Sequence, residues 1–134
     1  MSASPNNRVM DPRGKLLWVD GMAGAIVGVA MLTLGGWLSE LYRVPRDLLF
    51  LMGLVNLAYA SYSLTLASRA RRPIPLILLV AAANLIWSVF CFRWAVVFSD
   101  TASLFGLAHF VVEGLFVVAL ACLEWRWREL LQTA

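Results

Sequence analysis

Four long apolar blocks constrain this chain more than any other feature, because each is close to the length that a helix needs to cross a bilayer. A helix spans the hydrocarbon core of a membrane with about 20 predominantly apolar residues. The blocks cover roughly residues 16–38, 48–67, 74–98 and 102–123. Only 14% of the residues are charged, whereas soluble domains have about 25%. The chain is therefore predicted to be an integral membrane protein.

The connections between the blocks predict how the helices are arranged. They are the short segments SELYRVPRD, SRARRP and SDT, with Pro45 before the second block and Pro73 and Pro75 opening the third. Proline suits the first turn of a helix, and residues 99–101 (Ser-Asp-Thr) offer an N-cap to the fourth block. Short connections join antiparallel neighbours. We predict an all-α, up-and-down bundle of four transmembrane helices, as a single domain over residues 1–134, with a polar cytoplasmic tail over residues 1–15 and a helical cytoplasmic extension to about residue 131.

The basic residues predict the orientation of this bundle. Cytoplasmic loops of membrane proteins carry an excess of Lys and Arg. One side of the predicted bundle holds Arg8, Arg13, Lys15, Arg69, Arg71, Arg72, Arg126 and Arg128, and the other holds Arg43, Arg46 and Arg93. We therefore expect a multi-pass protein of the cell (inner) membrane with both termini in the cytoplasm. This bias accounts for most of the net charge of +3, so the charge does not indicate binding to nucleic acid.

Small and polar residues recur along one face of each block, and these faces are expected to point into the bundle. Helices in lipid associate through close packing of small residues and through hydrogen bonds between polar ones. The first block contains the pair Gly24-x-x-x-Gly28, which permits close approach of two backbones. The second and third blocks place Asn56 and Asn84 on such faces, with Tyr59 beside the former and Ser88 one turn after the latter.

The fourth block carries His109 and Glu113 on one face, about 40° apart around the helix, and Glu124 falls on the same stripe. At about 1.5 Å per residue, Glu113 lies roughly 16 Å into a core that is about 30 Å thick. Asn56 and Asn84 lie at similar depths, roughly 12 and 15 Å from their helix starts. We therefore predict a polar site near the midplane, formed by Glu113, His109, Asn56, Asn84, Tyr59 and Ser88.

Glu113 needs a proton, a partner or water at this depth, because a carboxylate at the bilayer centre costs at least about 2.5 kcal/mol. One interpretation makes Glu113 a proton-binding or acid/base group, with His109 as its relay and the two asparagines as orienting groups. The other makes the same residues a structural clamp in which Asn56 and Asn84 satisfy a protonated Glu113. Asp20 is expected in the first turns of its helix, close to water. The alternatives are an ion pair with Arg126 or Arg128 and a place in the floor of a pocket.

Three classes of function stay open. The favoured one is a protein that binds or transports a small organic, apolar or lipid-like solute at the polar site, working as a homodimer if it transports. The second is a membrane-embedded acid/base enzyme on a lipid-like substrate, although the sequence holds no catalytic signature. The third is an accessory subunit that docks another membrane protein through its glycines. The single histidine cannot supply paired haem ligands, and no metal motif is visible, so no cofactor or metal is predicted.

Overall fold

The computed structural model describes residues 12–133 and contains four long helices within that range. They are α2 (Leu16–Thr33), α4 (Arg46–Ala67), α5 (Ile74–Val97) and α6 (Leu104–Arg126). Each is long and apolar enough to cross a membrane. Three short elements accompany them, namely η1 (Pro12–Lys15), α3 (Gly35–Tyr42) and α7 (Arg128–Leu131). The prediction of an all-α, four-span membrane bundle is confirmed. The greater part of the predicted N-terminal tail, including Arg8, lies outside the described residues.

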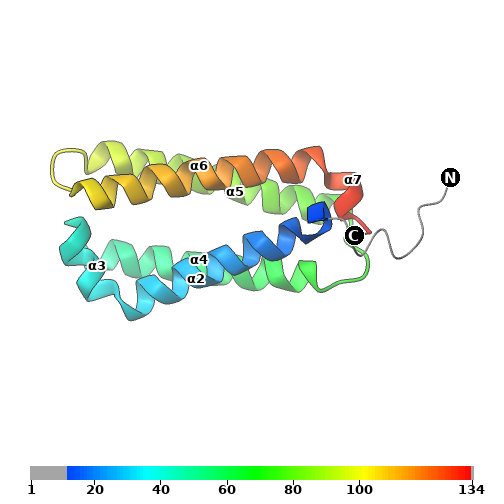
Figure 1. Ribbon diagram of the computed structural model, residues 1–134, viewed down its shortest axis with the longest axis horizontal. Helices are drawn as coiled ribbons and strands as arrows, with labels where there is room; N and C mark the ends of the chain where they lie inside the picture. Colours follow the sequence, from blue (N-terminus) through cyan, green and yellow to red (C-terminus); the bar gives the residue numbers. More distant parts are fainter. Residues whose placement is uncertain (1–11, 134) are drawn as a thin grey trace.

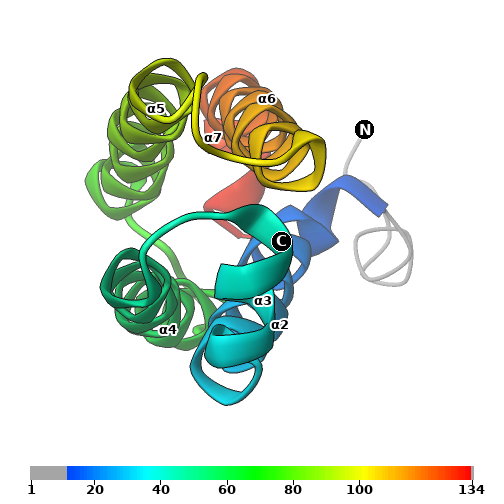
Figure 2. The same ribbon diagram turned by 90° about the vertical axis from the view of Figure 1, so that its left-hand side faces the viewer.

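The long helices form two antiparallel hairpins (Figures 1 and 2). Helix α2 packs mainly on α4, and α5 packs mainly on α6. Figure 1 shows the start of α2, the connection from α4 to α5 and the end of α6 at one end of the bundle, with α3 and the connection from α5 to α6 at the other. The segments that carry most of the basic residues therefore share one end of the molecule.

The first predicted helix is broken where the sequence analysis expected it to continue to residue 38. Helix α2 ends at Thr33, and α3 follows Leu34 after a change of direction that is visible in Figure 1. Two glycines, Gly35 and Gly36, begin α3, and glycine is the weakest helix former other than proline. Helix α3 ends at Tyr42, and its C-cap residue Arg43 adopts the left-handed conformation with φ 56°. Part of the segment SELYRVPRD is therefore helical rather than a loop.

The fourth long helix also starts later than expected. Its N-cap is Ser103, whose Oγ accepts a hydrogen bond from the backbone N–H of Gly106 at 3.2 Å. The same hydroxyl donates to the carbonyl of Leu41 at 2.6 Å. Residues 99–101 precede this cap in the connecting segment, so the prediction that they cap the helix is wrong.

Glycines bring α2 and α4 into close contact. A Cβ atom placed on Gly28 would lie 3.0 Å from the carbonyl oxygen of Gly53, and one placed on Gly53 would lie 3.2 Å from the carbonyl oxygen of Gly28. Gly24 faces the same helix, with Ala60 and the backbone of Asn56 as neighbours. The glycine face of α2 is thus covered within the chain, which removes the basis for docking a separate protein through Gly24 and Gly28.

Two apolar clusters close the two ends of the bundle. The cluster at the end that holds the start of α2 contains Leu16, Leu17, Leu66, Ala67, Ile77, Val80, Leu120 and Leu131. The cluster at the opposite end contains Met31, Leu38, Val44, Leu49, Met52 and Phe110. Large apolar side chains such as Ile26, Val89 and Val112 are exposed on the outside of the bundle, where a bilayer would cover them. The segment between the two clusters holds the candidate site.

Candidate functional site

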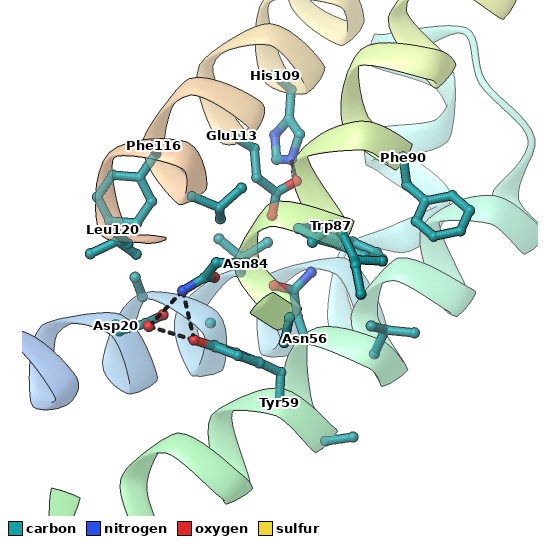
Figure 3. A pocket seen from close by; sticks show the side chains of 18 of the residues that line it. Asp20, Asn56, Tyr59, Asn84, Trp87, Phe90, His109, Glu113, Phe116 and Leu120 are labelled. Carbon is teal, nitrogen blue, oxygen red and sulfur yellow. Dashed lines mark hydrogen bonds and ion pairs between the residues drawn. The ribbon is translucent and has the colours of Figure 1, made fainter. Parts of the chain in front are cut away.

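A cavity of about 710 Å³ lies between the two hairpins, with residues of all four long helices in its wall. Ligand pockets in proteins commonly measure about 300–1,000 Å³. Every predicted polar-site residue except Ser88 lines the cavity, and Figure 3 shows several of them around it. Ser88 is buried, and its hydroxyl donates to the carbonyl of Leu85 at 2.6 Å.

The cavity wall is largely apolar and aromatic. Helix α5 contributes Trp87, Phe90 and Trp94, and helix α6 contributes Phe116. Trp87 and Trp94 pack edge to face, with ring centroids 5.4 Å apart. These rings form a stiff wall that would contact an apolar or flat molecule over a large area.

The cavity reaches the outer surface of the bundle between α4 and α5. Leu51 and Val55 on α4 and Ile86 and Phe90 on α5 line the cavity and are also exposed. These two helices make their main contacts with α2 and α6 rather than with each other. An apolar molecule could therefore enter from the surrounding lipid without crossing water.

A buried polar cluster closes one side of the cavity, with one residue from each long helix. Its members are Asp20 on α2, Tyr59 on α4, Asn84 on α5 and Glu124 on α6. Asp20 and Asn84 are each 2% exposed, and Glu124 is 0% exposed. A polar cluster with a member from every helix ties the two hairpins together.

The amide nitrogen of Asn84 is the centre of this cluster. Its Nδ2 lies 2.9 Å from Asp20 Oδ2, 2.9 Å from the Tyr59 hydroxyl and 2.7 Å from Glu124 Oε1. The Tyr59 hydroxyl donates to Asp20 Oδ2, and Figure 3 shows Tyr59, Asn84 and Asp20 pointing toward one another. Asn84 was expected to face Glu113, but its hydrogen bonds go to this cluster instead.

Asp20 and Glu124 are the residues that the sequence analysis misjudged or missed. Asp20 was expected near water at its helix start, which is wrong because it is buried. The alternative, a place in the wall of a pocket, agrees with its position in the cavity lining. Glu124 was placed on the inward face of the fourth block but was given no role in the predicted polar site, which was centred on Glu113. A signal was available, since Glu124 lies three turns after Glu113 on the same face of the helix. Its importance depends on contact with Asp20, which no spacing in the sequence reveals.

A second polar group lies at the other side of the cavity. His109 Nε2 is 3.2 Å from Glu113 Oε2, and His109 Nδ1 is 3.2 Å from the hydroxyl of Tyr42. Cys91 Sγ approaches the same glutamate oxygen at 3.8 Å. A neutral His109 can accept from Tyr42 at Nδ1 and donate to Glu113 from Nε2. Tyr42, His109 and Glu113 therefore form a hydrogen-bonded chain from the end of α3 to the cavity.

Tyr42 is suited to the donor role in this chain. Partial burial, followed by the negative charge of Glu113, raises the pKa of the Tyr42 phenol above 10.0. The hydroxyl thus stays protonated at neutral pH and can donate to His109. The side chains of His109 and Glu113 are 21% and 9% exposed, and both line the cavity.

Asn56 also lines the cavity, between the two polar groups in Figure 3. Its Nδ2 donates to the carbonyl of Met52 in its own helix at 2.9 Å. Within residues 12–133, no three His, Cys, Asp or Glu side chains gather so as to hold a metal ion.

Comparison of the chain with protein-family models, curated proteins and solved structures finds no match. The cavity and its two polar groups are therefore the features that indicate a function.

Proposed function

We propose that this protein binds a small apolar or amphipathic molecule inside the bilayer, in the cavity between its two hairpins. The observation that carries the proposal is the cavity itself, which combines a volume of about 710 Å³ with aromatic walls and two polar groups. Sites for small molecules are usually apolar hollows with a few polar groups that fix orientation. The opening between α4 and α5 supports entry from the lipid.

In this proposal, His109 and Glu113 bind one polar group of the ligand, while the rings of Trp87 and Phe90 contact its apolar body. Glu113 Oε2 contacts both His109 and Cys91, so the carboxyl is held in place before a ligand arrives. A positioned group loses less entropy on binding than a free one. Transport, as distinct from binding, would require a path across the whole membrane, which we expect a homodimer to supply.

A second candidate function is acid/base catalysis on a lipid-like substrate, favoured by the chain of Tyr42, His109 and Glu113. Proton transfer needs groups within hydrogen-bonding reach of one another, and the two distances of 3.2 Å in this chain meet that requirement. Glu113 would exchange a proton with the substrate, and His109 and Tyr42 would pass that proton to or from water at the end of the bundle that holds α3. A co-purified molecule that returns chemically altered after incubation would favour this function.

The binding proposal is tested by identifying what co-purifies with the protein. Mass spectrometry of extracts from protein in nanodiscs should detect a specific small molecule, absent from empty nanodiscs. Ala83→Trp fills the cavity and should abolish co-purification of the small molecule. Ala82→Trp changes the exposed neighbouring position and should leave the bound amount unchanged. Glu113→Gln should reduce the bound amount while the protein stays folded. Equal ligand content in Ala83→Trp and Ala82→Trp would refute the cavity as the site.

We also propose that the protein lies in the inner membrane with both termini in the cytoplasm, on the basis of its basic residues. The end of the bundle that holds the start of α2 and the end of α6 also holds Arg69, Arg71, Arg126 and Arg128. In a background without native cysteines, a membrane-impermeant maleimide should label Ser99→Cys from outside intact cells but not Thr133→Cys. The reverse labelling pattern would refute the orientation.

A further inference from the structure

The buried pair of carboxyl groups, Asp20 and Glu124, is the feature that binding through Glu113 leaves unexplained. Both carboxyl groups lie against one atom, Asn84 Nδ2, which is 2.9 Å from Asp20 Oδ2 and 2.7 Å from Glu124 Oε1. Glu124 Oε1 accepts from Asn84, but Glu124 Oε2 is buried and meets no donor among the described residues. A buried carboxylate oxygen without a donor is costly.

A proton on the pair supplies the missing donor. Two carboxylates in contact repel each other, and a buried pair of this kind holds one proton between its members. The groups that face the pair are the Tyr59 hydroxyl from α4 and the Asn84 amide from α5. A shared proton accounts for the close approach of the two acids.

The pair is also reachable from the cavity. Asp20, Tyr59 and Asn84 line the cavity, and Glu124 lies behind them. The described residues that line the cavity include the acids Asp20 and Glu113 and no Lys or Arg. Its aromatic rings, among them Trp87 and Phe116, offer faces that attract cations. The cavity is therefore built for a positive rather than a negative ligand.

We propose that Asp20 and Glu124 form a proton-binding site that exchanges its proton for the cationic group of an amphipathic ligand. In the ligand-free state the pair holds one proton and one negative charge. When an ammonium group enters beside Asp20, the proton leaves to water, and the site keeps a net charge of minus one. The exchange thus adds no net charge to the membrane interior. This inference rests on the proposed binding function and names the chemical class of its ligand.

The shared proton is tested first without any ligand. Infrared difference spectra between the wild type and the double variant Asp20→Asn/Glu124→Gln should show the loss of one protonated carboxyl and one carboxylate. The matched control Asp100→Asn/Glu129→Gln replaces two exposed acids and should lose carboxylate intensity only. The loss of two carboxylates and no protonated carboxyl from the first variant would overturn the proposal.

The exchange is tested with two probes that share one apolar body, 4-phenylbutyltrimethylammonium and 4-phenylbutanol. The first is permanently charged and carries no titratable proton, so any proton released on binding comes from the protein. Calorimetry of wild-type protein in nanodiscs at pH 7, in buffers of different ionisation enthalpy, should show release of about one proton per bound cation and none with the alcohol.

Asp20→Asn should weaken binding of the cation by at least about tenfold more than it weakens binding of the alcohol, because only the cation loses a charged partner. Asp100→Asn should bind both probes like the wild type. If wild-type protein binds the alcohol and shows no proton release with the cation, the exchange is refuted while the binding function stands. If neither probe binds, the binding function fails, and the exchange fails with it.

Discussion

The two glycines of Gly24-x-x-x-Gly28 look equivalent in the sequence, but the structure predicts that they respond differently to one added methyl group. A Cβ on Gly28 would lie 2.8 Å from Leu57 Cγ and 3.0 Å from the carbonyl oxygen of Gly53. The leucine can rotate away, but the carbonyl belongs to the backbone of α4. A Cβ on Gly24 would lie 3.4 Å from its nearest neighbour, the carbonyl oxygen of Asn56, which is an ordinary contact.

The magnitude follows from the two effects of the substitution. Both glycines lie inside α2, so alanine gains up to about 1 kcal/mol of helix propensity at either position. At Gly28, overpacking opposes this gain by about 1–3 kcal/mol. We therefore expect Gly28→Ala to be less stable than Gly24→Ala by about 1–3 kcal/mol, with Gly24→Ala at or slightly above the wild type.

The assay is reversible unfolding in mixed micelles, with the free energy of unfolding obtained from helicity as the fraction of sodium dodecyl sulfate rises. Comparing the two variants with each other cancels the propensity gain and leaves the packing effect. Equal stabilities for Gly24→Ala and Gly28→Ala, or a less stable Gly24→Ala, would show that the α2–α4 contact does not have the geometry described.

Three further predictions concern single side chains. Asn84→Leu should lower the free energy of unfolding by about 1–3 kcal/mol, because Nδ2 has two protons to donate and each buried bond in a membrane protein contributes about 0.6–1.7 kcal/mol; an unchanged value would contradict the central role of this amide. Ser103→Ala should cost about 0.5–2 kcal/mol through loss of the N-cap, whereas Ser99→Ala should cost nothing measurable in the same titration. At position 43, which is left-handed, the midpoint temperature of thermal unfolding should be highest for Arg43→Gly, intermediate for the wild type and lowest for Arg43→Val. A Cβ in this conformation costs about 1–2 kcal/mol, and a branched side chain adds to that cost. The opposite order would exclude this conformation.

The candidate site was only partly predictable. The one-sided placement of His109 and Glu113 on a helix follows from a four-residue spacing, and both line the cavity. The partners of Asn84 did not follow from the sequence. Helical periodicity shows which face of a helix carries a residue, but it does not show which residue of another helix that residue contacts. Its amide reaches Asp20 and Glu124, which are far from it in the sequence. The cavity itself was not predictable, since it depends on how far apart the hairpins stand.

What the sequence determined by itself was the number of spans and their antiparallel order, because helix length and polarity must match the bilayer and short connections leave no other path. It also determined which face of each helix carries polar groups, because that depends only on the period of the helix. The tertiary structure alone decided where α2 breaks, which two acids meet and where a hollow remains. These features depend on contacts between segments that are distant in the chain. Each such contact is decided by the sizes and orientations of several side chains at once.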